Sequence, residues 1–185
     1  MLTASIKQFK YYKQLVDKAL SQIEDTYLFA KENDNDNSIA VIIQHLSGNM
    51  KSRWTNIFTE DGEKKWRNRD TEFEESLMQR EELISLWESG WHVLFHTLEN
   101  LTDDDLVKIV YIRNEGLSVQ DAILRQLCHY SYHCGQIVIK CKIYNNGNWL
   151  SLSIPKNESQ QFNSKKFEEP KQEKHFLDSL LDPTS

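Results

Sequence analysis

The stretch SVQDAILRQLCHYSYHCGQIVIKCKIY, residues 118–144, decides the fold because it predicts one long helix that carries two histidines. Ser118 and Asp121 resemble a capping box at its start, and the helix is expected to run to about Tyr144, before NNGN. His129 and His133 lie four residues apart within it. Side chains at that spacing lie about 40° apart around a helix and about 6 Å along it, so both imidazoles can reach one metal ion.

Three further amphipathic helices are predicted before this one. Apolar residues recur every three to five positions over residues 1–30, which indicates one long helix that KENDNDN breaks. Ser38 is a plausible N-cap of a second helix, which continues to about Phe58. A third helix is expected from about Glu74 to Asn100. Four long helices in one chain predict an all-α fold, a four-helix bundle.

The segments outside the four helices are shorter and more polar. LVKIVYIRNEGLSV, before the fourth helix, combines a β-branched run with Asn-Glu-Gly and predicts an extended connector or small hairpin. KKFEEPKQEK is charged and contains a proline, so the end of the chain is expected to be mobile. HFLDSLLDPTS favours one short helix. We therefore expect one domain over residues 1–165 and a polar tail over residues 166–185.

Composition excludes several classes of function. The chain of 185 residues has 28 acidic and 22 basic side chains, a net charge of −6, and no basic block that could follow a phosphate backbone. No nucleic-acid partner is therefore expected. No window approaches the roughly 18 apolar residues of a membrane span, and the N-terminal residues lack the apolar stretch of a signal peptide. The expected location is cytoplasmic, without a membrane partner.

Three cysteines lie on the predicted fourth helix. Cys134 and Cys141 would be about 10 Å apart along its axis, too far for a disulfide, so buried free thiols are expected. Cys128 and Cys134 adjoin the two histidines in sequence but point about 100° away around the helix. Neither is expected to bind the metal or to act as a nucleophile.

A second His-x3-His pair, His92 and His96, competes with the first. Helical-wheel positions do not separate the pairs, because each lies away from the apolar centre of its helix. Spacing alone leaves either pair as a metal site or as surface histidines. The surroundings favour the first pair, whose polar stripe collects groups that could orient a ligand or bind an anion: Arg125, Gln126, Tyr132 and Gln136.

Two motifs together resemble a known superfamily. IIQHLSGNM at residues 42–50 and HYSYHCGQI at residues 129–137 look like the corresponding segments of the DinB-like superfamily of four-helix-bundle metalloenzymes. LWESGWHVLFHTL and NWLSLSIPKNESQQFN resemble one branch of that superfamily, known mainly as proteins of unknown function. The resemblance covers about residues 1–165.

The resemblance implies a ligand set. In DinB-like proteins one histidine of the second helix and the His-x3-His pair of the fourth bind a divalent metal, which maps onto His45, His129 and His133. His92 and His96 match no ligand position. Three imidazoles leave a coordination position for water or substrate, and they suit zinc or nickel. Arg125, Tyr132 and Gln136 are candidates for groups around the ligands, and no residue identifies itself as catalytic.

The reaction stays open at this level. Some DinB-like relatives are metal-dependent transferases that use low-molecular-weight thiols such as bacillithiol or mycothiol, and this chain resembles them in its triad. The alternatives are a metal-dependent hydrolase and a non-catalytic metal-binding protein associated with stress. Five tryptophans and seven tyrosines are more amphipathic aromatics than one bundle core readily hides, which predicts a homodimer, although loops could also cover them in a monomer.

Overall fold

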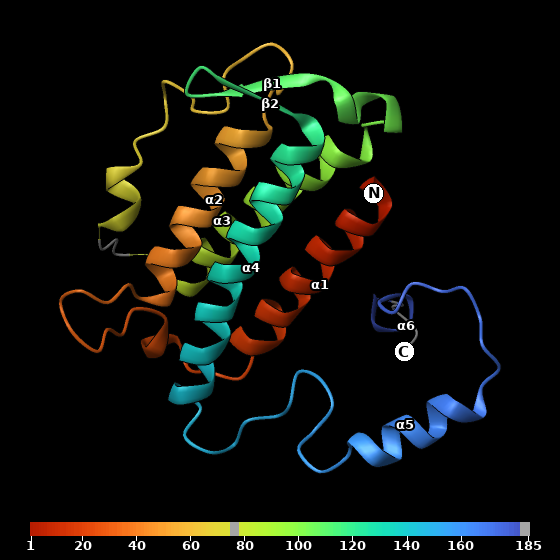
Figure 1. Cartoon of the computed structure of the whole chain (residues 1–185). Coiled ribbons are helices and arrows are strands. Elements are labelled where there is room, and N and C mark those ends of the chain that lie inside the picture. The colour runs from red at the N-terminus through yellow and green to blue at the C-terminus, as the bar shows by residue number, and fades with distance from the viewer. Residues whose placement is uncertain (75–77, 182–185) are drawn as a thin grey trace.

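The computed structural model describes residues 1–74 and 78–181 and is mostly helical. Four long helices lie side by side (Figure 1), α1 packing mainly on α4 and α2 mainly on α3. Among the described residues, no helix is both long and apolar enough to cross a membrane. The long helices are α1 (Leu2–Leu20), α2 (Ile39–Trp54), α3 (Arg80–Glu99) and α4 (Val119–Tyr144).

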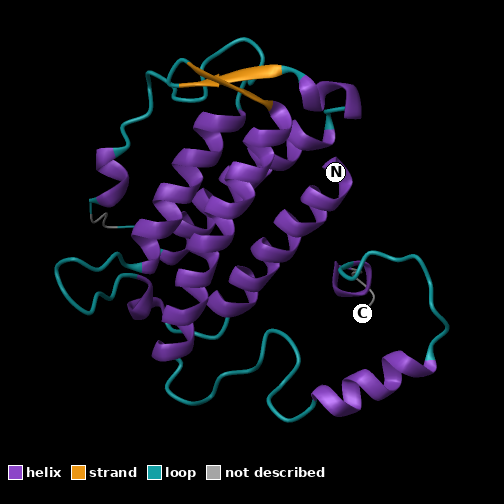
Figure 2. Ribbon diagram, in the orientation of Figure 1, coloured by secondary structure: helices purple, strands orange, loops and turns teal. Residues whose placement is uncertain are grey.

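Shorter elements connect and follow these helices (Figure 2). The connections contain the 3-10 helices η1 (Asp25–Leu28), η2 (Asp70–Phe73) and η3 (Asp103–Val107) and the strands β1 (Ile109–Ile112) and β2 (Glu115–Ser118). The helices α5 (Ser159–Glu168) and α6 (Asp178–Leu181) follow α4. The all-helical class predicted from the sequence is therefore correct apart from one two-stranded sheet.

Helix α1 ends ten residues earlier than the predicted helix over residues 1–30. The Arg80 guanidinium donates to the carbonyl oxygens of Leu20 at 2.6 Å and Ile23 at 3.4 Å, so a side chain from the start of α3 satisfies acceptors at the end of α1. The chain then turns into η1. The prediction failed here because apolar spacing continued past Leu20, whereas the contact that ends the helix is a tertiary one.

Helix α2 begins as predicted and ends earlier. The Ser38 hydroxyl accepts a hydrogen bond from the Val41 N–H at 3.2 Å, which confirms Ser38 as the N-cap. The helix ends at Trp54 rather than near Phe58, because Thr55 is extended, with ψ 128°, and Asn56 has a positive φ of 49°.

Helix α3 begins at Arg80 rather than near Glu74. Gln79 is its N-cap, and the Gln79 and Glu82 side chains each bond to the other residue's backbone as a capping box. Glu74 has an extended backbone, and residues 75–77 lie outside the described part of the chain. Helix α3 ends at Glu99, within one residue of the predicted end.

The connector before α4 is the predicted hairpin. Strands β1 and β2 are antiparallel, with Ile112 opposite Glu115, and Arg113 and Asn114 form the turn. Both turn residues have positive φ, 57° and 62°, as a type I′ turn requires. The Asp61 carboxylate, from the loop after α2, accepts hydrogen bonds from both of their N–H groups at 2.8 Å. These hydrogen bonds hold the hairpin against the loop that follows α2.

The buried core joins the four long helices through Tyr130. Its ring lies 5.8 Å from that of Phe9 and 6.0 Å from that of Trp91, centroid to centroid. Its hydroxyl accepts from Trp54 Nε1 at 3.1 Å and donates to Asn49 Oδ1 at 3.0 Å. These partners come from α1, α3 and α2, so the neighbouring position on α4, residue 129, is held firmly relative to α2.

The chain beyond α4 forms an extended arm that returns to α1. Helix α5 is exposed along its whole length and lies apart from the long helices (Figure 1). At the far end, Leu177 is fully buried and Asp178 pairs with Lys7 of α1. Helix α5, which sequence patterning did not predict, runs across the boundary expected at residue 165. Helix α6 lies within the stretch where a short helix was predicted, and residues 182–185 are not described.

Candidate metal centre

Three histidines from two helices meet between α2 and α4. His45 Nε2 lies 3.3 Å from His129 Nε2, and one ring nitrogen from each of His45, His129 and His133 lies within 4.8 Å of the other two. His45 is buried, whereas His129 and His133 are partly exposed. The triad expected from the sequence is thus brought together, although His45 is 84 positions away from His129.

Hydrogen bonds to the Nδ1 atoms orient two of the rings. His45 Nδ1 lies 2.9 Å from Glu72 Oε2, and His133 Nδ1 lies 2.7 Å from Gln136 Oε1. Because a carboxylate and an amide oxygen only accept, each Nδ1 carries the proton and each Nε2 is left with its lone pair. Gln136 in turn donates through Nε2 to the Tyr132 hydroxyl at 3.0 Å.

The carboxylate beneath His45 is itself held in place. Arg67 donates to Glu72 twice, from Nε to Oε1 at 2.7 Å and from Nη2 to Oε2 at 2.8 Å, a planar fork between side chains that are 2% and 10% exposed. Burial alone would raise the pKa of Glu72, but the bonds from His45 and Arg67 and the positive charge of Arg67 leave that pKa below its usual range. Glu72 is therefore an anion at neutral pH.

The two histidines of α4 are neutral at neutral pH. Burial lowers the pKa of His129 to about 3, with further contributions from His133, His45 and the two guanidinium groups of Arg53 and Arg67. Burial also lowers the pKa of His133. Neutral imidazole is the form that binds metal ions, so the site is preset for a cation.

The donor set fits a divalent transition metal. Tetrahedral coordination with Zn–N bonds of about 2.0–2.1 Å places neighbouring ligand nitrogens about 3.3–3.4 Å apart. The His45 and His129 Nε2 atoms lie at 3.3 Å. Glu72 and Gln136, which accept from the Nδ1 atoms of His45 and His133, resemble the outer groups that usually orient metal-bound imidazoles.

The other residues singled out from the sequence lie in different places. Tyr132 and Gln136 form a hydrogen-bonded row beside His133, whereas Arg125 is exposed on α4. His92 and His96 are exposed on α3, with ring centroids 6.1 Å apart, and within residues 1–74 and 78–181 they join no cluster of three possible metal ligands.

One family model matches the chain. It describes a protein of unknown function, DUF1572, and it covers residues 1–158. The chain belongs to the DUF1572 family. The three histidines and Glu72 fall inside the match, while α5 and α6 lie beyond it. No curated protein and no solved structure matches the chain.

Sequence patterning missed two residues of this DUF1572 site. Arg67 and Glu72 belong to the segment between α2 and α3, which is rich in charged residues and contains no pattern that marks a metal site. The Phe73 ring of the same segment lies 4.9 Å from the His45 ring, centroid to centroid, and the Arg69 guanidinium lies over the Phe73 ring, 5.0 Å from its centroid. The loop after α2 therefore covers His45 with both polar and aromatic groups.

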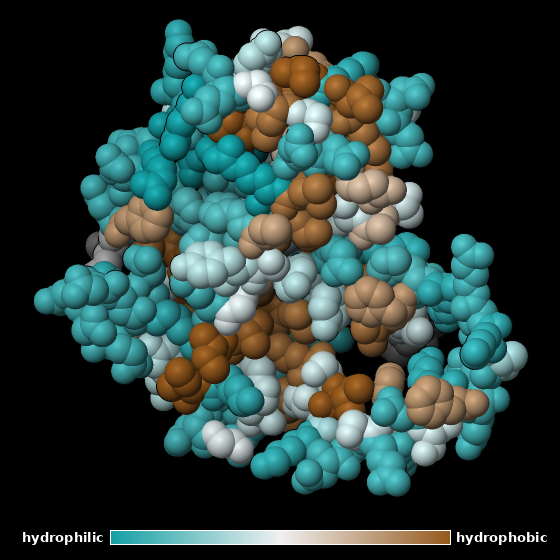
Figure 3. Space-filling model, viewed as in Figure 1, coloured by the Kyte–Doolittle hydropathy of each residue, from teal (hydrophilic) through white to brown (hydrophobic). Residues whose placement is uncertain are grey.

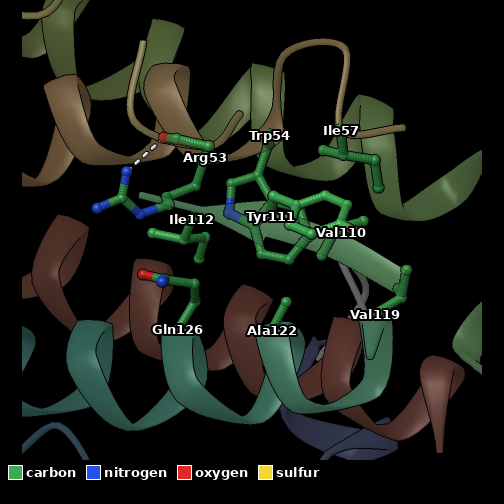
Figure 4. Close-up of a pocket in the computed structure, with 10 residues that line it drawn as sticks. Arg53, Trp54, Ile57, Val110, Tyr111, Ile112, Val119, Ala122 and Gln126 are labelled. Carbon is green, nitrogen blue, oxygen red and sulfur yellow. Dashed lines mark hydrogen bonds between the residues drawn. The ribbon is translucent and has the colours of Figure 1, made fainter. Parts of the chain in front are cut away.

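A cavity of about 20 Å³ lies between α2, α4 and the hairpin of the DUF1572 chain (Figure 4). Gln126 and Arg53 line one end, where Arg53 donates to the Gly62 carbonyl, and the other walls are mostly apolar. Pockets that bind small molecules measure about 300 Å³ or more. This cavity is too small for a substrate, and none of the three histidines lines it. The triad is accessible at His129 and His133, which are partly exposed.

Proposed function

We propose that this DUF1572 protein binds a divalent metal ion, zinc or nickel, through the Nε2 atoms of His45, His129 and His133. The supporting observation is the 3.3 Å approach of the His45 and His129 Nε2 atoms while His45 Nδ1 is engaged by Glu72. Such an arrangement leaves a coordination position for water or a substrate, as in catalytic rather than structural sites.

The proposal includes a fold relationship, a four-helix bundle of the DinB-like type. Support comes from the packing of α1 on α4 and α2 on α3, and from the positions of one histidine on the second long helix and a pair on the fourth. The similarity of the segments around His45 and His129 to DinB-like sequences points the same way.

We propose metal-dependent transfer of a low-molecular-weight thiol, of the bacillithiol type, as the activity. A bound divalent ion lowers the pKa of a coordinated thiol or water and so supplies a nucleophile at neutral pH. Cys134 and Cys141 are poor candidates, because burial raises the pKa of Cys134 and raises that of Cys141 to about 12. Cys128 is exposed, contrary to the burial expected for all three cysteines. A small external thiol can instead approach from the partly exposed side, beside His133 and Tyr132.

The test has a binding stage and a turnover stage. Calorimetric titration of the metal-free protein with zinc and with nickel should show one site per chain. The loaded protein is then assayed with an electrophile plus a small thiol and, separately, with hydrolysable esters. Thiol-dependent consumption of the electrophile supports the transferase, whereas ester cleavage without thiol supports a hydrolase. Binding without either turnover would leave a non-catalytic metal-binding protein, and absence of binding would overturn the proposal.

We also propose a homodimer that associates through α4. Leu124, Ile139 and Ile143 are exposed on this helix, by 43%, 53% and 62%. Figure 3 shows hydrophobic surface among hydrophilic groups on the face where α4 lies. Exposed apolar side chains gathered on one helix are typical of protein contacts rather than of solvated surface.

A further inference from the structure

Glu72 connects the triad to the loop that covers it. Its Oε2 atom bonds to His45 Nδ1, and Arg67 holds both carboxylate oxygens. Arg67 also reaches Glu63 Oε1 at 3.4 Å, and Glu63 Oε2 accepts from Arg53 Nη2 of α2 at 3.0 Å. The chain of charges begins and ends on α2, so Glu72 has a fixed position relative to the helix that carries His45.

Gly48 makes room for this carboxylate. It lies one turn after His45 on α2, and a Cβ atom built there would be 2.1 Å from Glu72 Oε1 and 2.8 Å from Glu72 Cδ. Both distances are far below van der Waals contact. Glu72 cannot move aside freely because the Arg67 fork and the His45 ring fix both of its oxygens. A glycine at position 48 is therefore a requirement of the Glu72 position, although α2 itself would favour almost any other residue.

We propose that Glu72, clamped by Arg67 and seated over Gly48, is a positioning residue that keeps the proton of His45 on Nδ1 and directs its Nε2 atom at the metal. This inference rests on the proposed metal site. A carboxylate in this role fixes the tautomer and ring orientation of a ligand histidine and raises its basicity as a ligand.

A purely structural role for Glu72 predicts a different outcome. If the carboxylate only neutralised buried Arg67, its loss would lower the stability of the fold and leave the His45 tautomer and the intrinsic metal affinity unchanged. The two roles are therefore separated by the imidazole nitrogen signals of His45 in the metal-free protein, which report which nitrogen carries the proton.

Two variants remove the contact by different routes, and a third serves as a matched control. Glu72→Ala removes the carboxylate. Gly48→Ala leaves Glu72 intact but displaces it. Gly135→Ala places the same substitution inside α4, where the added Cβ meets nothing within 4 Å. Both glycine variants should gain helix propensity, so a difference between them measures the displacement of Glu72.

The experiment combines nitrogen NMR of the metal-free proteins with zinc titration. In the unaltered chain and in Gly135→Ala, His45 should be the Nδ1–H tautomer. In Glu72→Ala and Gly48→Ala it should lose that single tautomer, and zinc affinity should fall about 10- to 100-fold. An unchanged His45 tautomer and unchanged affinity in both variants would overturn the inference. If the unaltered chain bound no zinc, the proposed function would fail, while the metal-free spectra would still decide whether Glu72 controls His45.

Discussion

His45 Nε2 and His129 Nε2 lie 3.3 Å apart, although the two residues belong to different helices and are 84 positions apart in sequence. Only the folded packing of α2 against α4 produces this approach. His129 is further held by its neighbour Tyr130, whose hydroxyl bonds to Asn49 and Trp54 of α2. Metal binding should therefore depend on folding, and folding should be favoured by metal.

The first prediction concerns the ligands. Alanine at His45, His129 or His133 should reduce zinc or nickel affinity by more than about 100-fold, which exceeds the loss expected for an outer group. Helical content should change little, because the core is built from other side chains. Calorimetric titration and circular dichroism measure the two quantities.

His92→Ala and His96→Ala are the controls for that prediction. They repeat the His-x3-His spacing on an exposed helix face with no third ligand near them among the described residues. Both variants should bind metal like the unaltered chain. Full affinity in His45→Ala, or a loss in either control, would contradict the assignment of the triad.

Local sequence signals predicted the elements that carry the triad. Ser38 and Ser118 each cap a helix through a hydrogen bond to the third following N–H, and such short-range chemistry is visible in sequence. Helix α4 runs to Tyr144, as expected. Spacing could pair His129 with His133 but could not choose them over His92 and His96. Resemblance to a known superfamily supplied His45.

Tertiary contacts explain what sequence reading missed. Helix α1 ends at Leu20, where the Arg80 guanidinium donates to the Leu20 carbonyl oxygen. No pattern within residues 1–30 indicates that Arg80 is the partner. Glu72 lies in a loop 27 positions after His45 and bonds to its ring. Its carboxylate lies against Gly48, and nothing in the sequence marks Gly48 as a position that must be small. Charged loop residues are usually solvated, and here they are buried because they satisfy one another.

The second prediction concerns self-association. Replacing Ile139 with Glu on the exposed face of α4 should convert a dimer into a monomer, since a charge would have to be buried in the contact. Light scattering at micromolar concentration measures the mass. Val107→Glu, at a residue that is 78% exposed in η3, is the control and should not change it. A monomeric mass for the unaltered chain would refute the homodimer itself.

The third prediction concerns the C-terminal arm. Removing residues 159–185 deletes α5 and α6 and should leave metal affinity unchanged, because the triad and Glu72 contact neither helix. Stability should fall by less than about 3 kcal/mol, the upper value for burying one leucine, since Leu177 is fully buried. Denaturant titration measures this loss. Deletion of 166–185 should give the same loss, and a change in affinity with either deletion would contradict the proposed independence of the site.

The fourth prediction concerns pH and the hairpin. Partial burial tends to raise the pKa of Asp61, but hydrogen bonds from the backbone N–H groups of Asn114, Glu63 and Arg113 leave it below the usual value. The unfolded chain therefore binds a proton more readily than the folded one, and the contribution of Asp61 to stability is present above about pH 4 and is lost as pH falls further.

Asp61→Asn should accordingly destabilise the protein by about 1–2 kcal/mol at pH 7, because a charged acceptor shared by three N–H groups is replaced by one amide oxygen. The difference between the two proteins should shrink as pH falls below about 4, because the unfolded chain, in which the pKa of Asp61 is higher, takes up the proton first. Denaturant midpoints measured from pH 7 to pH 3 provide the comparison. Asp34→Asn, at an exposed loop residue, is the control and should show little difference at any pH. A constant difference across the range would show that shape, not charge, gives Asp61 its role in holding the Arg113–Asn114 turn.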